Sequence, residues 1–199
     1  MKSVRTVVTG IGVVTPLGCD TGNFWQSLVA GRSGVGRISR FDVSAYPTQI
    51  AAEVKDFDES RFLEKKEARR MDQSEQYAIG ASQLAIDDSG LNLAKTDLDR
   101  AGVVIGSGIG GVGTLYQQTK ILLEKGPRRL SPFLAAVYIC NMASGQVSIT
   151  LGARGPNICT TTACASGGHA IGEAFETIRR GDAAVIFAGG TEASVVPIS

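Results

Sequence analysis

The sequence predicts an α/β fold in which a mostly parallel sheet carries helices on both faces. Apolar strand segments alternate with helical segments along the chain, which is the pattern of such folds. Hydrophobic residues make up 43% and charged residues 20% of the 199 residues, which suits one globular domain or two small ones. The 25 glycines cluster beside β-branched runs, so they indicate tight turns and close backbone approaches.

Five short apolar runs that end in glycine or turn residues are predicted to form strands. They cover residues 4–9, 49–54, 102–106, 156–160 and 183–189. Residues 32–46 contain turn residues without a clear period and are predicted to form a loop.

The predicted helices begin at capping residues and end at glycine. Asp20 and Thr21 can cap a helix through Ala30, and Asp72 can cap one that reaches about Asp88. Pro132 is predicted to begin a further helical stretch. The remaining predicted helices cover residues 112–125, 142–151 and 165–180.

Charge and cysteine usage exclude several classes of protein. A formal net charge of +1 argues against bulk nucleic-acid binding and against a polybasic membrane anchor. The first residues lack the pattern of a signal peptide, and no run of about 18 apolar residues occurs. We therefore expect a cytoplasmic protein with four reduced cysteines. The single histidine and the scattered cysteines argue against a zinc site, and no metal is expected.

Residues 106–111, with the sequence GSGIGG, fit a dinucleotide-binding turn between a strand and a helix. That fingerprint also needs an acidic residue at the end of the next strand, about 20 positions on. Glu124 has nearly the right spacing, but it lies within the predicted helix. A tight turn with close packing is therefore the favoured interpretation.

Cys164 is the candidate nucleophile, because it lies where a strand turns into a helix. The unpaired N–H groups and the dipole of a helix N-terminus favour a thiolate there and can stabilise an oxyanion. Its neighbours are small, and Gly168 leaves room beside the sulfur. The alternative is a small buried cysteine that only fills the core, and the residues alone leave both interpretations open.

His169 is the one histidine of the chain, and it is not expected to be the base for Cys164. Five residues along a helix correspond to about 140° of rotation, so the two side chains point apart. We expect a structural role for His169 in the core or at an interface. The sequence offers no obvious acid or base to serve Cys164.

Several segments together resemble the β-ketoacyl-acyl-carrier-protein synthases, and most closely the elongating members of that family. The string TTTACASGGHAIGEA around Cys164 is similar to their nucleophile motif. Other matching segments begin at residues 7, 41, 65, 106, 126, 151 and 188, in the family's order and spacing. Because GSGIGG belongs to this pattern, the resemblance implies no nucleotide and no cofactor.

The resemblance implies a thiolase-like fold, of which residues 1–199 form the N-terminal half. Each half of such enzymes has a five-stranded, mostly parallel sheet, and the enzymes are homodimers. The family's two catalytic histidines, its active-site lysine and a glycine-phenylalanine loop lie in the other half, which this chain does not match. We therefore expect a truncated enzyme or one piece of a two-chain enzyme.

The resemblance also implies roles for individual residues. Cys164 would take an acyl chain from acyl carrier protein and pass it to the carbanion formed by decarboxylation of malonyl-carrier protein. Ile109 and Leu134 would line acyl pockets, Leu134 that of the partner subunit, and ordinary core packing is the alternative for both. A basic patch would receive the acidic carrier protein, with a solvated charged face as the alternative. The patch would consist of Lys66, Arg69, Arg70, Arg128 and Arg129.

Three other interpretations stay open at this point. The chain resembles chain-length-factor subunits, which bind acyl chains without catalysis, although those usually lack the cysteine. It also resembles condensing enzymes of polyketide pathways. A folded half-domain that only binds or acts as a scaffold is the third possibility.

Overall fold

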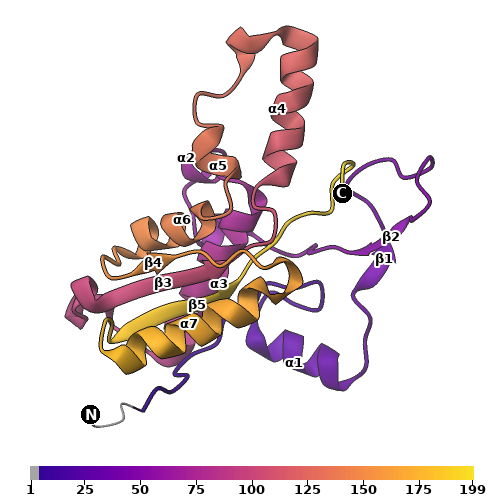
Figure 1. The fold of residues 1–199 in the computed structure, drawn as a ribbon. Coiled ribbons are helices and arrows are strands. Elements are labelled where there is room, and N and C mark those ends of the chain that lie inside the picture. The colour runs from indigo at the N-terminus through magenta and orange to yellow at the C-terminus, as the bar shows by residue number, and fades with distance from the viewer. Residues whose placement is uncertain (1–4) are drawn as a thin grey trace.

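The computed structural model describes residues 5–199, and its centre is a parallel sheet in the order β4–β3–β5 (Figure 1). β3 (Ala101–Gly106) lies in the middle, between β4 (Asn157–Ile158) and β5 (Val185–Gly190). Every residue of β3 is buried, as expected for a central parallel strand that is covered on both faces. These strands confirm the predictions for residues 102–106, 156–160 and 183–189, with β4 shorter than predicted.

Helices cover both faces of this sheet, as predicted (Figure 1). α3 (Gln73–Ser89) and α6 (Met142–Leu151) pack with Val103 and Ile105 of β3 in one core cluster. Val104 points the opposite way and packs against Ala170 and Ala174 of α7 (Ser166–Arg180). Alternate residues of one strand therefore supply two cores.

The helix ends follow the capping residues in the sequence. Asp20 accepts a hydrogen bond from the Asn23 N–H at 2.8 Å and caps α1 (Thr21–Val29). Asp72 caps α3 in the same way, by accepting from the Ser74 N–H. α3 ends at Gly90, whose φ of +66° favours glycine.

β1 (Val35–Arg37) and β2 (Ile50–Ala52) form a separate antiparallel pair. β2 confirms the strand predicted at 49–54. The loop predicted over residues 32–46 is wrong at β1, because that strand exists through its pairing with β2 rather than through a local pattern. Between β2 and β3 the chain also forms short helical turns: η1 (Glu59–Arg61), α2 (Lys65–Ala68), η2 (Leu93–Lys95) and η3 (Leu98–Arg100).

Residues 112–138 form an arm that projects from the sheet (Figure 1). The arm consists of α4 (Val112–Lys125), η4 (Pro127–Arg129) and a return to α5 (Ala135–Tyr138). The Gly111 N–H donates to the Tyr138 carbonyl at 2.9 Å and closes its base. None of the α4 residues is buried. The helix predicted to begin at Pro132 begins three residues later, at Ala135.

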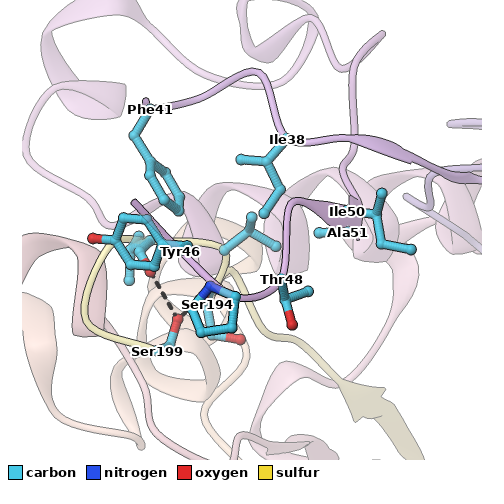
Figure 2. A pocket seen from close by; sticks show the side chains of 11 residues that line it. Ile38, Phe41, Tyr46, Thr48, Ile50, Ala51, Ser194 and Ser199 are labelled. Atoms are coloured by element: carbon cyan, nitrogen blue, oxygen red, sulfur yellow. Dashed lines mark hydrogen bonds between the residues drawn. The ribbon is translucent and has the colours of Figure 1, made fainter. Parts of the chain in front are cut away.

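The last residues of the chain cover the β1–β2 region and leave a small apolar cavity of about 360 Å³. Figure 2 shows Phe41 and Tyr46 together with Ser194 and Ser199 among the residues that line it. The Tyr46 hydroxyl donates to the Pro197 carbonyl at 3.0 Å, which ties the two segments together. The cavity is a packing gap between these segments, and Cys164 does not line it.

The strand predicted over residues 4–9 is absent from residues 5–9, which have no regular structure, while Val4 lies outside the described residues. Val7 and Val8 are exposed, although a strand there was expected to be buried. The following Gly10 packs so closely on α3 that a Cβ would lie 2.2 Å from the Ala85 carbonyl oxygen. A groove of about 610 Å³ separates this segment from β5.

No helix among residues 5–199 combines the length and the apolar character needed to cross a membrane.

Candidate active site

The carboxyl ends of the three parallel strands bring the candidate residues together. β3 leads into the turn at 107–111, β4 leads into residues 159–165, and β5 leads into Thr191 and Glu192. The Ser107 N–H donates to the Thr160 carbonyl at 3.2 Å, and the Thr191 N–H donates to the Gly106 carbonyl at 3.0 Å. This edge of an open parallel sheet is where such folds usually place a ligand.

Cys164 lies in the middle of the short turn η5 (Ala163–Ala165), directly before α7. The thiol is free and exposed, so the interpretation of Cys164 as a buried packing residue is wrong. Ala163 has a φ of +51°, and it is the only non-glycine residue among 5–199 with a positive φ. Such a backbone is strained for a residue with a Cβ, and here it precedes the candidate nucleophile.

Ser166 holds this turn from the first position of α7. Its hydroxyl donates to the Ala163 carbonyl at 2.7 Å and accepts from the Thr162 N–H at 2.9 Å. The Thr160 hydroxyl donates to the Ser166 carbonyl at 2.8 Å. The predicted helix 165–180 therefore begins one residue later than expected, because η5 takes up Ala165.

Glycines let the start of α7 approach the strand ends. A Cβ at Gly106 would lie 2.4 Å from the Ser166 carbonyl oxygen, and a Cβ at Gly190 would lie 2.8 Å from the Cα of Gly167. A Cβ at Gly168 would meet nothing within 4 Å, so space beside Cys164 is open, as the sequence predicts. The Cys164 turn therefore rests directly on the ends of β3 and β5.

His169 is exposed and bonds to the loop before the cysteine, with 2.8 Å between its Nδ1 and the Thr162 hydroxyl. It is not a core histidine, so that part of the prediction is wrong. Among residues 5–199 no hydrogen bond joins His169 to Cys164. This agrees with the expected angular separation on the helix.

The N–H groups of the GSGIGG turn bind the carboxylate of Glu192, so they are not open to an external anion. One carboxylate oxygen of Glu192 accepts from the N–H groups of Gly108 and Ile109, at 2.7 and 3.2 Å. Its other oxygen accepts from the Ser107 hydroxyl at 3.2 Å. Sequence reasoning missed Glu192, since it follows a strand 84 residues beyond Gly108 and carries no local signal of this contact.

The two candidate acyl-pocket residues lie in different places. Ile109 sits in the turn that contacts Ala163, and half of its surface is exposed, so it is not packed in the core. Leu134 is half-buried at the start of α5, near the base of the arm. Within one chain the structure brings Ile109, and not Leu134, to the turn that carries Cys164.

The five basic residues lie on two segments of the chain, one at α2 and one after α4. Arg70 lies over the Phe133 ring at 5.4 Å, so the Lys66–Arg70 segment adjoins the return of the arm. Arg128 and Arg129 follow α4, whose 14 residues span about 20 Å. All five are exposed, and the ion pairs of residues 5–199 involve only Arg154, Arg179 and Arg180.

Known proteins are similar to this chain in sequence and in fold. The family model "Beta-ketoacyl synthase, N-terminal domain" matches residues 4–199. The 3-oxoacyl-[acyl-carrier-protein] synthase 2 of a Synechocystis species is 49% identical over 199 residues, which is 100% of this chain and 48% of that protein. The enzyme of the same name from Coxiella burnetii is 48% identical over 198 residues, again 48% of its length.

A solved structure of the ishigamide ketosynthase/chain length factor aligns with a TM-score of 0.85 and 31% identity, over 94% of this chain and 47% of that one. The chain spans about half the length of the curated relatives that it matches. Sequence, fold and the strand-end position of Cys164 agree, and the chain therefore belongs to the β-ketoacyl synthase family, whose N-terminal domain it matches almost from end to end.

Proposed function

We propose that this chain supplies the nucleophile of a condensing enzyme that elongates acyl chains in fatty-acid synthesis, with Cys164 as the catalytic residue. The observation that carries the proposal is the exposed thiol in a strained turn at the carboxyl ends of the sheet. Curated relatives named 3-oxoacyl-[acyl-carrier-protein] synthase 2 support the same reaction.

The chemistry divides into an acylation and a condensation. The Cys164 thiolate attacks the carbonyl of an acyl thioester, a new thioester forms at Cys164, and the donor's thiol leaves with a proton. Malonyl-carrier protein then loses carbon dioxide, and the carbanion displaces Cys164 from the acyl group. The product is a β-ketoacyl thioester that is longer by two carbons. We assign Ile109 to the acyl pocket, beside the turn that carries the sulfur.

Acylation of Cys164 tests the proposal directly. Intact-mass measurement after incubation with an acyl-carrier thioester should show one acyl group on the wild-type chain and none on Cys164→Ala. Iodoacetamide should modify Cys164 faster than the less exposed Cys19, Cys140 and Cys159. A chain that stays unacylated while its fold is intact contradicts the proposal. Because the family's histidines belong to the other half, we expect residues 1–199 alone to show no sustained malonyl-dependent condensation.

We further propose that residues 1–199 are one half of a thiolase-like enzyme and that its sheet has five strands. The outer edge of β5 and the extended segment 6–12 face each other across the 610 Å³ groove. A strand inserted there would pair with β5 on one side and with residues 6–12 on the other. The exposed Val7, Val8 and Ile11, together with Ile171 and Phe175 of α7, would then become buried.

Hydrogen exchange distinguishes this arrangement from a merely irregular N-terminus. In the full-length protein the amides of residues 7–11 should exchange as slowly as those of β3. In the isolated 199 residues they should exchange fast, because nothing pairs with them. Equally fast exchange of these amides in both forms would contradict the proposed five-stranded sheet.

The partners we propose are an acyl carrier protein and a second copy of this chain, in the cytoplasm. In one solved relative, with a TM-score of 0.83 and 26% identity over 96% of this chain and 51% of that one, a type II polyketide acyl-carrier protein is in complex with its ketosynthase. The exposed basic residues of α2 and η4 suit an acidic carrier. The arm presents Leu115, Leu122, Leu123 and Phe133 outward, which suits a homodimer in which Leu134 closes the partner's pocket.

A chain-length-factor-like subunit is the second candidate, because the similar ishigamide structure carries that description as well. The acylation measurement separates the two functions. A subunit of this kind would bind acyl chains without forming a thioester at Cys164.

A further inference from the structure

Glu192 is held inside the site by three hydrogen bonds, although the proposed chemistry does not use it. Its carboxylate accepts from the N–H groups of Gly108 and Ile109 and from the Ser107 hydroxyl. The Ser107 hydroxyl in turn accepts from the Gly110 N–H at 3.0 Å. Successive N–H groups that point into one concavity form an anion-binding nest, and here the chain's own carboxylate fills it.

The nest holds Ile109 and lies near the turn that carries Cys164. A Cβ built at Gly108 would lie 2.9 Å from the Glu192 carboxylate and 3.6 Å from the Cα of Ala163, so Gly108 lies close to both Glu192 and that turn. The Ile109 side chain is half exposed, so few packing contacts hold it in place. Its place beside the cysteine turn therefore depends on its backbone, which Glu192 holds.

We propose that Glu192 is a positioning residue that sets the length of the acyl chain accepted at Cys164, by fixing the backbone of Ile109. The inference rests on the proposed function, since it assumes that Cys164 carries an acyl chain and that Ile109 borders it. Glu192 does not touch the reacting atoms in this arrangement, and its effect passes through the 107–110 turn. Loss of the carboxylate frees the turn and relaxes selection against long chains.

The test uses the full-length protein and a thiol reagent series that needs no catalysis. Methanethiosulfonates with methyl, hexyl and decyl groups react with the Cys164 thiolate: sulfur attacks sulfur, a mixed disulfide forms and methanesulfinate leaves. The methyl rate reports the reactivity of the thiol, and the ratio of decyl to methyl rates reports the room beside Ile109. Cys19, Cys140 and Cys159, with any cysteine outside residues 1–199, are replaced by serine so that only Cys164 reports.

Glu192→Ala should raise the decyl-to-methyl ratio by about threefold or more while the methyl rate changes by less than about twofold. Glu192→Gln can turn its amide oxygen toward the N–H groups of Gly108 and Ile109 and its NH₂ toward the Ser107 hydroxyl, so it keeps the hydrogen bonds without the charge, and its ratio should stay near that of the wild type. Glu192→Asp keeps the charge, and its ratio should fall between those of the wild type and Glu192→Ala. The matched control is Glu176→Gln, because Glu176 pairs with Arg179 on the surface of α7.

An unchanged decyl-to-methyl ratio in folded Glu192→Ala overturns the inference. An equal loss of rate for all three reagents also overturns it, because Glu192 would then support only the cysteine turn. If Glu192→Ala does not fold, as judged by circular dichroism, the ratio of Glu192→Asp decides, because its shorter side chain cannot reach the same N–H groups without moving the turn. Failure of the proposed function is a separate result, since Cys164 would then resist acylation by carrier thioesters whatever the ratio does.

Discussion

Ala163 has a strained backbone directly before Cys164, the proposed nucleophile. Its left-handed backbone, with a φ of +51°, costs an L-residue about 1–2 kcal/mol. The Ser166 hydroxyl holds it in place, by donating to the Ala163 carbonyl and accepting from the Thr162 N–H. Strain of this kind persists only where the surroundings enforce it, which fits a turn that must expose Cys164.

Substitutions at Ala163 should show how the backbone strain at this residue affects the stability of the protein and the reactivity of the Cys164 thiol. Ala163→Gly should keep the alkylation rate of Cys164 and leave stability equal or higher by up to about 1 kcal/mol. Ala163→Val places a β-branched residue in a left-handed backbone, so it should lower stability by about 2 kcal/mol and slow alkylation. Urea unfolding and iodoacetamide kinetics measure both. A valine variant with wild-type values would show that the turn is not constrained.

Two buried carboxylates of this chain respond to pH in opposite directions. Glu75 is almost fully buried with both oxygens unbonded, and burial, with the charge of Asp72, raises its pKa to about 8. Glu53 is also buried, and burial tends to raise its pKa. Hydrogen bonds from Ser39 and Arg40 outweigh that effect and hold the pKa of Glu53 below its usual value.

The raised pKa of Glu75 predicts that the folded state loses stability as the pH rises. Its folded pKa lies above the unfolded one, so the folded state binds the extra proton. Stability therefore falls between about pH 4.5 and pH 8, by at most about 1.4 kcal/mol per pH unit. Glu75→Gln should flatten that slope and stabilise the chain at pH 8, as measured by urea midpoints. Glu53→Gln is the control, because it should leave this window unchanged. Identical slopes in wild type and Glu75→Gln would contradict the assignment.

At the scale of elements, the contact between α7 and the end of β5 positions the site. Gly167 and Gly190 approach backbone to backbone, and no side chain fits between them. Gly190→Ala should lower stability by roughly 2 kcal/mol and slow Cys164 alkylation, because α7 must move outward. Gly172→Ala, on the open face of the same helix, should instead gain up to about 1 kcal/mol from helix propensity. Equal effects of the two variants in urea unfolding would rule out this role for the contact.

The elements with local signals were predictable from the sequence, and those that depend on distant partners were not. Asp20, Asp72 and Gly90 mark helix ends because capping acts within a few residues. β1 carried no local signal, and the apolar run at residues 4–9 predicted a strand that residues 5–9 do not form, since a short strand depends on what lies beside it. The position of Cys164 before α7 was predicted for the same local reason. The hydrogen bond between the Gly108 N–H and the Glu192 carboxylate could not be predicted, because it joins two loops that are far apart in the sequence.

For the whole molecule, the proposed docking of a carrier protein depends on the charge of the exposed surface. Arg129, beyond the far end of α4, makes no ion pair within residues 5–199 and is free to meet an acidic partner. Arg129→Glu should slow acyl transfer from acyl-carrier protein by about threefold or more at low salt, and less at high salt. Transfer from a small acyl thioester should not change.

The matched control for this charge reversal is Lys95→Glu. Lys95 precedes the amino end of β3, opposite the end that leads to Cys164, and it is exposed. It should leave transfer from both donors unchanged. If Lys95→Glu slows transfer from the carrier protein as strongly as Arg129→Glu does, net charge rather than a docking surface would be responsible.

The groove beside β5 has a consequence for how such a protein is made. In a polypeptide as long as its curated relatives, this half leaves the ribosome while roughly 200 residues remain to be translated. At about 5–20 residues per second, the open edge of β5 would wait on the order of 10–40 seconds for the strand proposed above. During that time Val7, Val8 and Phe175 would stay exposed to water, and chaperones bind exposed apolar residues of this kind. We therefore expect the nascent chain to need protection from aggregation until the rest of the protein has been synthesised.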